Sequence, residues 1–420
     1  MTEKIKIDFE NTIKNLNLTD KKVELRKKNL ESFIKKGFPN KRVEEWKFSD
    51  LNQIISSNIK ELSFFNKVTE QSNFDKSIII KNFDHNKIIF INGLLFKVDF
   101  EYEEKNNIEI IENDDSESVA DTKNPLIHLN GAFRNSYLRI IIKEGYLLKK
   151  PLIVYHINND KISQKAINQK IDFVLEDGSS LKIINIFDEK SENNFINIYN
   201  KFKLGKNSIL KNYKIDFKIN SNIKYLYDDI ELDRNSISEN FILSSGSRFI
   251  KNEINCNLND EYSSAFINGI INLKDKQHHE IKTNINHLAE NTKSYQLIKC
   301  VLNDSSKGVY QGKIFVDPSA QKTDGYQLSK AILLNEKSEF NAKPELEIYA
   351  DDVKCSHGST SGSLDDDAIF YLMSRGISKK AAYTLLINGF LLDVVEKITD
   401  TEIKYLILEL MGVKEWAFQI

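Results

Sequence analysis

The sequence contains little cysteine and none of the motifs that mark the common self-contained enzymes. Three cysteines among 420 residues are too few and too widely spaced for a disulfide framework. A P-loop, a C-x-x-C pair, an H-E-x-x-H segment and a G-x-S-x-G turn are absent, and no dinucleotide fingerprint follows a strand. These absences argue against a P-loop ATPase, a usual ferredoxin or zinc ribbon, and an ordinary self-contained enzyme.

Long apolar runs and an excess of one charge are missing as well. No run approaches the ~20 apolar residues that cross a bilayer, and the N-terminus lacks a secretory apolar segment. The 59 Lys and Arg residues nearly balance the 61 Asp and Glu residues, so no basic stripe indicates nucleic acid. We therefore expect a cytoplasmic protein that binds neither membrane nor nucleic acid.

The N-terminal part of the chain shows mixed but mainly helical patterns. Apolar residues recur at helical spacing after Thr19, a good N-cap, until Gly37 ends the pattern. In the run 42–49 (RVEEWKFS), Trp46 and Phe48 are expected to anchor the segment to the core. Short apolar runs predict strands within 76–102, polar residues predict an exposed loop over 112–124, and 125–133 fits a short helix. Residues 1–135 are thus predicted to form a helical and mixed N-terminal region.

Residues 136–362 read as short strands with little helix between them. A leucine followed by small, charged or amide residues recurs at steps of about 26 to 32 residues, with one longer interval. Helical solenoids need long faces of helical period, which this segment lacks. A parallel β-helix and an all-β sandwich with irregular hairpins both remain compatible with the pattern.

The C-terminal region, residues 363–420, is predicted to be helical. Asp365 to Asp367 suit a helix N-terminus, and Ser378 suits the N-cap of the next helix. A third helix is expected around 403–411. The apolar content is high for helices with one buried face, so an exposed portion would be a docking surface for a partner.

The segment richest in potential chemistry is 351–362, which contains Cys355 and His357. Two residues apart in a strand, their side chains would project on the same face, about 7 Å apart along the chain. A thiolate beside an imidazole can bind iron or zinc, or can act as a nucleophile–base pair. The spacing is equally compatible with a buried cysteine and a hydrogen-bonded histidine. Two ligands do not complete a metal site, so another segment or a second chain would have to contribute.

The remaining histidines and cysteines are weaker candidates. His278 and His279 would face opposite sides of a strand, so they cannot easily share a metal, and His287 lies eight residues further on. Structural or surface roles are the better interpretation. Cys256 and Cys300 have no cysteine or histidine nearby and are expected to be buried.

Long segments of the chain resemble signatures of the SufB/SufD family of iron–sulfur cluster assembly scaffold proteins. The resemblance is strongest in 309–328 (VYQGKIFVDPSAQKTDGYQL), 343–358 (KPELEIYADDVKCSHG) and 370–377 (FYLMSRGI), and weaker in 42–49 and 287–296. The run CSHG at 355–358 is closer to the SufD branch than to the SufB branch. Ser359 and Ser361 depart from the Ala and Val that often follow that glycine.

The resemblance implies a right-handed parallel β-helix core between helical N-terminal and C-terminal regions. It also implies a scaffold subunit without catalysis of its own, which pairs with a SufB-like paralogue and binds a SufC-type ABC ATPase through its C-terminal helices. His357 would lie at the SufB interface, where iron or a nascent iron–sulfur cluster is held transiently; Cys355 is a second candidate ligand. When isolated, the chain could form a homodimer.

Two other functions compete with the scaffold. A carbohydrate-active β-helix enzyme would need a secretion signal and a groove rich in Asp, Arg and aromatic residues, and the signal is absent. A stand-alone thiol enzyme would use Cys355 with His357 and would need a thiol of low pKa.

Overall fold

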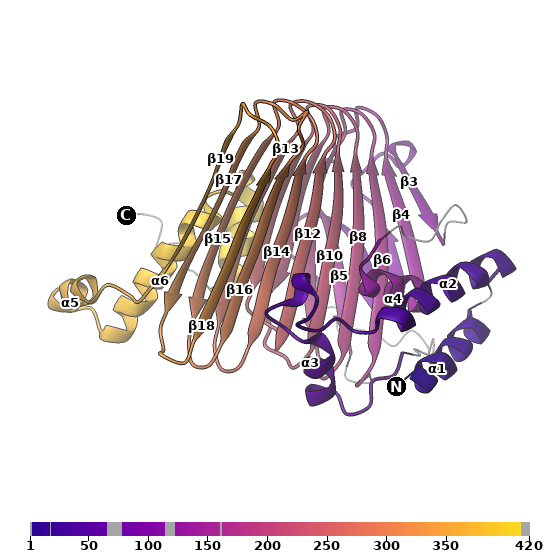
Figure 1. The fold of residues 1–420 in the computed structure, drawn as a ribbon, viewed down its shortest axis with the longest axis horizontal. Coiled ribbons are helices and arrows are strands. Elements are labelled where there is room, and N and C mark those ends of the chain that lie inside the picture. The colour runs from indigo at the N-terminus through magenta and orange to yellow at the C-terminus, as the bar shows by residue number, and fades with distance from the viewer. Residues whose placement is uncertain (1, 17, 65–77, 114–121, 160–161, 413–420) are drawn as a thin grey trace.

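The middle of the chain forms a parallel β-solenoid (Figure 1). The computed structural model describes residues 2–16, 18–64, 78–113, 122–159 and 162–412. From β4 to β19, successive strands alternate between two sheets, so each of these strands pairs in parallel with the strand two positions away. At the other end, β2 and β3 pair antiparallel with β1 and β4. The ten-stranded sheet has the order β19-β17-β15-β13-β11-β9-β7-β5-β1-β2, and the nine-stranded sheet has the order β18-β16-β14-β12-β10-β8-β6-β4-β3. The predicted parallel β-helix is therefore confirmed, and the sandwich alternative is wrong.

The solenoid strands begin at residue 136 and end at residue 362. They are β4 (Ser136–Ile142), β5 (Leu152–Asn158), β6 (Ala166–Leu175), β7 (Ser180–Glu189), β8 (Phe195–Leu204), β9 (Ile209–Asp216), β10 (Ile223–Leu232), β11 (Ile237–Ser244), β12 (Phe249–Leu258), β13 (Ser264–Leu273), β14 (His278–His287), β15 (Lys293–Leu302), β16 (Lys307–Val316), β17 (Asp324–Leu333), β18 (Glu339–Ile348) and β19 (Lys354–Gly362). Three earlier strands extend the sheets at the opposite end: β1 (Asn86–Ile91), β2 (Leu94–Asp99) and β3 (Ile108–Glu112). Part of the predicted N-terminal region thus hydrogen-bonds into both sheets.

The recurring leucine before each polar turn has a structural cause. On four successive rungs it holds the same register and points into the core, as Leu175, Leu204, Leu232 and Leu258. The turns that follow need a residue with positive φ, supplied by Gly178 (69°), Asn207 (58°) and Asn235 (57°). Glycine and asparagine tolerate this left-handed conformation best. The repeat seen in the sequence is therefore one rung of the solenoid.

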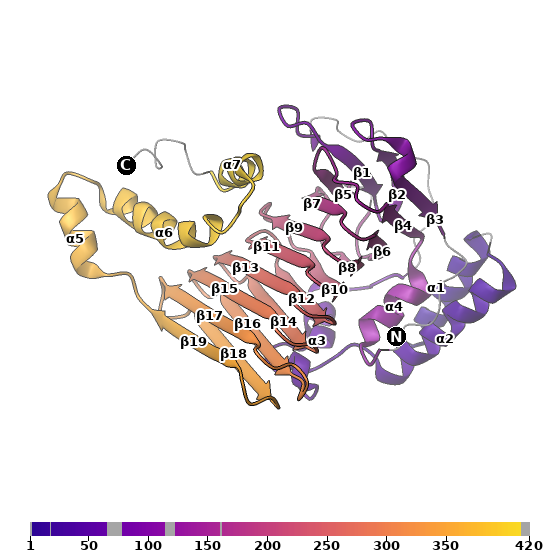
Figure 2. The same ribbon diagram turned by 90° about the horizontal axis from the view of Figure 1, so that it is seen from above.

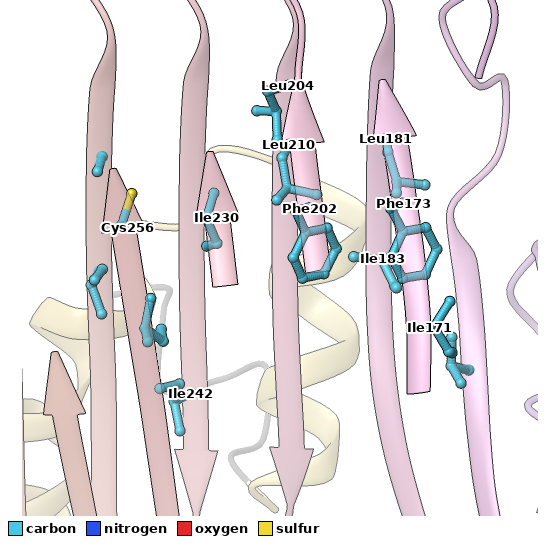
Figure 3. Close-up of a cluster of buried hydrophobic side chains, with 14 of the residues drawn as sticks. Ile171, Phe173, Leu181, Ile183, Phe202, Leu204, Leu210, Ile230, Ile242 and Cys256 are labelled. Carbon is cyan, nitrogen blue, oxygen red and sulfur yellow. The ribbon is translucent and has the colours of Figure 1, made fainter. Parts of the chain in front are cut away.

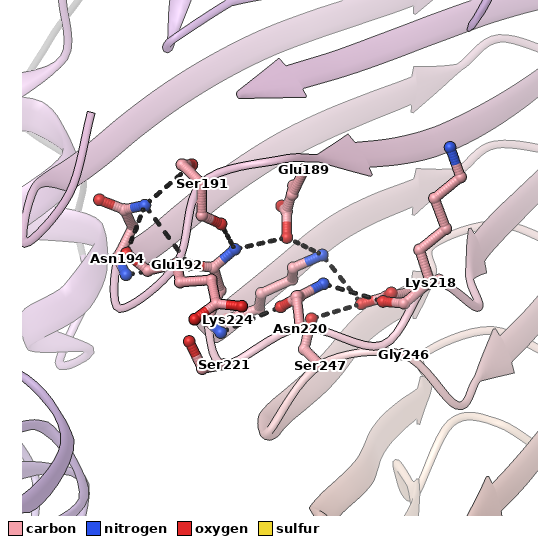
Figure 4. A network of polar contacts seen from close by, with 12 residues as sticks. Glu189, Ser191, Glu192, Asn194, Lys218, Asn220, Ser221, Lys224, Gly246 and Ser247 are labelled. Carbon is pink, nitrogen blue, oxygen red and sulfur yellow. Dashed lines mark hydrogen bonds and ion pairs between the residues drawn. The ribbon is translucent and has the colours of Figure 1, made fainter. Parts of the chain in front are cut away.

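Apolar side chains fill most of the space between the sheets. In Figure 3, Phe173 and Phe202 stack on neighbouring rungs with ring centroids 5.0 Å apart. Buried charges interrupt this core near the ends of β7 and β9, where Lys224 lies 2.9 Å from both Glu189 and Asp216 (Figure 4). Because each buried charge has an opposite partner, the interior tolerates these groups.

Helices cover the outer faces of the two sheets (Figure 2). On the nine-stranded side lie α1 (Thr2–Asn15), α2 (Asp20–Lys36), the 3-10 turn η1 (Glu44–Trp46), α3 (Leu51–Asn58) and α4 (Pro125–Phe133); the short 3-10 turn η3 (Lys105–Asn107) precedes β3. Trp46 is 3% exposed, and the Lys251 ammonium lies 4.4 Å from its ring centroid. The prediction that Trp46 anchors its segment is confirmed.

In its described residues the C-terminal region contains three helices, of which the last two lie against the ten-stranded sheet. They are α5 (Asp366–Ser374), α6 (Lys379–Val395) and α7 (Thr401–Leu410), and buried apolar residues of α6 and α7 pack against that sheet. Asp365 and Ser378 cap α5 and α6 through their side chains, as predicted. α5 projects beyond the last strands of the solenoid (Figure 2).

Two further predictions are confirmed, and a third concerns residues that the structure mostly does not describe. The strands expected within 76–102 are β1 and β2, and the helix expected at 125–133 is α4. The loop expected at 112–124 lies mostly outside the described residues. Within the described ranges, no helix has both the length and the apolar character of a membrane span.

Candidate functional site at the open end of the solenoid

The last rung of the solenoid consists of β18 and β19, the terminal strands of the two sheets. Each has one edge with no neighbouring strand in the described part of the chain. Because no further strand of the described chain covers this rung, its interior side chains are more exposed than those of the rung before it. Ile348 on β18 is 37% exposed, whereas Val316, its register partner on β16, is fully buried. Core positions at this end therefore open to solvent.

Cys355 and His357 lie on β19 and share the face directed at the solenoid interior. Their register partners on β17 are Gly325 and Gln327, and Gln327 is fully buried. Strand periodicity correctly predicted that the two side chains project on the same side. Their exposure nevertheless differs, because Cys355 is half-buried and His357 is exposed.

The Cys355 side chain lies in an apolar environment. It packs with a small cluster that includes Ile314, Val316 and Leu346, and a Cβ added at Gly325 would lie 3.3 Å from its sulfur. Burial raises the pKa of the Cys355 thiol. At neutral pH the group is therefore a protonated thiol, a poor nucleophile and a poor metal ligand. This environment opposes a stand-alone thiol enzyme.

Polar side chains are aligned with His357 on the preceding rungs and form what we call the polar column, Gln296, Gln327 and Tyr310. Gln296 on β15, Gln327 on β17 and His357 on β19 occupy one register on consecutive rungs. The hydroxyl of Tyr310 on β16, in the opposite sheet, lies within hydrogen-bond distance of the Oε1 atoms of Gln296 (3.1 Å) and Gln327 (3.2 Å), which share its single proton. The Gln327 Nε2 donates to the Glu345 carbonyl of β18 (3.2 Å). This column ties the two sheets together directly below the last rung.

The sequence alone did not single out Gln296, Tyr310 and Gln327. Tyr310 and Gln327 fall inside the 309–328 signature, and Gln296 ends the weaker match before it. Residues 296, 327 and 357 are separated by about one solenoid repeat, a spacing that could have indicated the column.

The three histidines of β14 and the two other cysteines are structural. His279 contacts the Ser244 hydroxyl (2.9 Å) and the Ser247 carbonyl (2.6 Å), and burial lowers its pKa to about 4. His287 contacts the hydroxyls of Thr292 (2.7 Å) and Ser294 (2.8 Å).

His278 lies 2.9 Å from Glu280 on the outer face of β14. Cys256 and Cys300 are buried in the solenoid core. The structural interpretation of these five residues is confirmed.

No metal centre is complete within the described part of the chain. No group of three or more His, Cys, Asp or Glu side chains is placed there to hold a metal ion. Cys355 and His357 remain a pair.

A second exposed surface lies on α5. Phe370 is 73% exposed, Tyr371 57% and Met373 44%. These side chains fall in the 370–377 segment of the resemblance, and only residues 363–365 separate α5 from β19. The helix with the exposed apolar side chains is thus joined almost directly to the strand that carries His357.

The fold defines the class: a two-sheet β-solenoid with helical extensions and an open last rung that presents a histidine. A family model described as "SUF system FeS cluster assembly, SufBD core domain" matches residues 156–390. The chain belongs to this SufBD family of the SUF system for iron–sulfur cluster assembly.

Similarity to single relatives agrees with this assignment. The iron–sulfur cluster assembly protein SufD of Escherichia coli is 27% identical over 392 residues, which cover 91% of this chain and 90% of that protein. The SufD protein of Bacillus subtilis is 44% identical over 66 residues, 16% of this chain and 15% of that protein. A SufBD family protein of Synechocystis is 47% identical over 66 residues, with the same coverage of 16% and 15%. The resemblance to the SufD branch is confirmed.

Proposed function

We propose that the chain is a non-catalytic scaffold subunit of the SUF assembly complex and acts in the cytoplasm. It pairs with a SufB-like paralogue at the open end of the solenoid and binds a SufC-type ABC ATPase, which hydrolyses the ATP, through its C-terminal helices. His357 contributes to iron entry or to formation of the nascent cluster. The observation that carries the proposal is the exposure of His357 on an interior-facing position of the last rung.

The edge strands support pairing with another chain. β18 and β19 present backbone N–H and C=O groups along their outer edges, and such edges are templates for a further strand. A partner that covered the rung would also bury Ile348 and the other interior positions exposed there. The same contact would bring donor atoms of the partner to His357. When the paralogue is absent, a second copy of this chain could occupy the edge.

The chemistry of the rung favours His357 over Cys355 as the iron ligand. Iron or the cluster is cargo here, held only until it is passed on. Imidazole is a common iron ligand, whereas the Cys355 thiol has a raised pKa and binds only after losing its proton. Imidazole is also a weaker ligand than thiolate, which suits transfer. Cys355 would contribute only if a bound metal displaced its proton.

The α5 surface supports the ATPase contact. Phe370 and Tyr371 are large apolar side chains exposed on a helix that projects from the molecule. Exposed aromatic clusters of this kind mark protein interaction sites. Because α5 follows β19 after residues 363–365, movement of the bound ATPase would pull on the strand that carries His357.

Co-purification tests the proposal. The chain is produced with the SufB and SufC proteins of its own organism, and cluster formation is followed by absorbance and by iron and sulfide content. His357→Ala should leave the complex intact but lower the cluster yield. Thr360→Ala, exposed on the opposite face of the same strand, is the matched control and should behave as wild type.

Two results would count against parts of this proposal. Full cluster yield with His357→Ala would keep the scaffold and remove the role of His357. Failure to isolate any complex with SufB and SufC would remove the scaffold role itself.

A further inference from the structure

The last strand of the solenoid turns a row of polar side chains toward the interior. Besides Cys355 and His357, the same face of β19 carries Ser359 and Ser361, because alternate residues of a strand share one face. The facing interior positions of β18 are all apolar: Phe340, Ala342, Pro344, Leu346 and Ile348. The open end therefore has one polar wall and one apolar wall.

Ser359 lies directly above a second serine. Its register partner on β17 is Ser329, which is 1% exposed and donates its hydroxyl proton to the Ser359 Oγ at 2.9 Å. This hydrogen bond confirms that the Ser359 side chain is directed toward the interior. On β15 the same register position is Ile298, which is fully buried. An aliphatic position of the core thus becomes a hydroxyl pair on the last two rungs.

The proton of the Ser359 hydroxyl has no acceptor within the described chain. A serine hydroxyl can donate one hydrogen bond and accept two, and here Ser359 accepts from Ser329. Accepting that bond polarises the Ser359 O–H and strengthens it as a donor. The residue is exposed, and the apolar wall of β18 faces it across the rung. The acceptor that suits this donor must therefore come from outside the chain.

We propose that Ser359 is a further binding residue for the cargo: its hydroxyl donates a hydrogen bond to a sulfide of the nascent cluster, and Ser329 positions it. The inference rests on the proposed function of His357, which would hold iron two residues away on the same face. Residues i and i+2 of a strand lie about 7 Å apart, so the two side chains flank one space at the open end.

Sulfide is the acceptor that this space favours. Sulfide bonded to iron carries negative charge, and hydrogen bonds to it stabilise a cluster and raise its reduction potential, because the reduced cluster is the more negative. Ser359 stands where an alanine often follows the glycine of the CSHG run in the family, so the hydroxyl distinguishes this chain.

The cluster-loaded complex tests this hydrogen bond. The chain is produced with the SufB and SufC proteins of its own organism as wild type, Ser359→Ala and Ser359→Thr. Loss of the cluster to excess EDTA is followed by absorbance, and the reduction potential is measured by dye-monitored titration. Ser359→Ala should lose the cluster about fivefold faster, the ratio that one net hydrogen bond supports, and its cluster should have a lower potential. Ser359→Thr keeps the hydroxyl and should restore both properties.

Two other substitutions separate a bond to the cluster from a general effect on the strand. Ser356→Ala removes an exposed hydroxyl from the outer face of β19 and should match wild type. Ser329→Ala removes the donor that polarises Ser359 and should change the loss rate and the potential in the same direction as Ser359→Ala, but less. An unchanged loss rate and potential in Ser359→Ala would overturn the inference, as would an equal change in Ser356→Ala. A weaker complex with an unchanged cluster would also overturn it, because the hydroxyl would then bind the partner.

Comparison with His357→Ala distinguishes this inference from the proposed function. A cluster that is weakened by His357→Ala but not by Ser359→Ala would reject the inference alone. A cluster that is weakened only by Ser359→Ala would keep the hydrogen bond and reject the role of His357. A cluster that neither substitution affects would reject both, since it would lie away from the last rung.

Discussion

Gly312→Ala should destabilise the open end of the solenoid although it adds a single methyl group. Gly312 lies on β16, inside the core, where the Tyr310 and Gln327 side chains meet. A Cβ at this position would lie 2.2 Å from the Gln327 Oε1 and 2.3 Å from the Tyr310 hydroxyl. Neither atom is the free end of a flexible surface chain, since both belong to buried, hydrogen-bonded groups. The methyl group can be accommodated only if these two side chains move apart.

The expected loss follows from two contributions. Overpacking a closed core costs about 1–3 kcal/mol. Separating Tyr310 from its two glutamine partners removes the hydrogen bond that its single hydroxyl proton makes with them, a net contribution of about 1 kcal/mol. The free energy of unfolding should therefore fall by about 2–4 kcal/mol.

Urea unfolding followed by circular dichroism and by tryptophan fluorescence measures this loss. Gly362→Ala is the matched control, because a Cβ there has no heavy atom within 4 Å and the residue ends β19. The control should shift the free energy of unfolding by less than about 0.5 kcal/mol. A Gly312→Ala chain as stable as the control would refute the packing described here, and with it the fixed Gln327 amide.

Four further outcomes are expected. Gly389→Ala in α6 meets no atom within 4 Å and should raise the free energy of unfolding by about 0.5–1 kcal/mol, measured by urea unfolding. Lys251→Met leaves the buried Glu280 carboxylate without its 2.6 Å partner and should cost about 3–5 kcal/mol, part of which returns in a double variant with Glu280→Gln. Burial lowers the pKa of His287 from 6.5 to about 4, so the unfolded chain binds a proton first and stability falls as the pH drops across that window. His287→Leu should make this loss between pH 6.5 and pH 4 shallower by about 1.4 kcal/mol per pH unit; an unchanged slope would contradict the neutral, buried imidazole. Cys355 should react with iodoacetamide at pH 7 more slowly in the folded than in the urea-unfolded chain, because burial raises the thiol pKa.

The fold could be predicted from local signals because each rung repeats them. Leucine at the end of a strand and a residue tolerant of positive φ in the turn recur along the chain, as at Leu204 and Asn207. Caps such as Ser378 likewise depend on the residue and its immediate neighbours. Local signals do not say how successive strands pair, which is why the sequence pattern alone left a β-sandwich open. The resemblance at 309–328 and 343–358 decided between the two folds.

Only those features of the candidate site that lie within a single strand could be predicted from the sequence. Alternation placed Cys355 and His357 on one face, since that relation is set by the strand itself. The difference in their exposure depends on where the solenoid ends and on the apolar cluster around Ile314. The polar column depends on register between strands about 30 residues apart. Such contacts become visible in a sequence only after the repeat has been aligned rung by rung.

The uncovered last rung of the solenoid connects the exposed core positions with the proposed role of the protein. Ile348 is 37% exposed where its register partner Val316 is buried, so the last rung exposes apolar surface that a cap would cover. Covering it is favourable, which gives a partner strand a driving force to bind there. His357 occupies another interior-facing position of the last rung, on the facing strand, and binding of the partner would enclose it. A metal held by His357 and the partner would then sit in a space that neither chain encloses alone. We therefore expect cluster formation to depend on pairing, because the same surface completes the core and the ligand set.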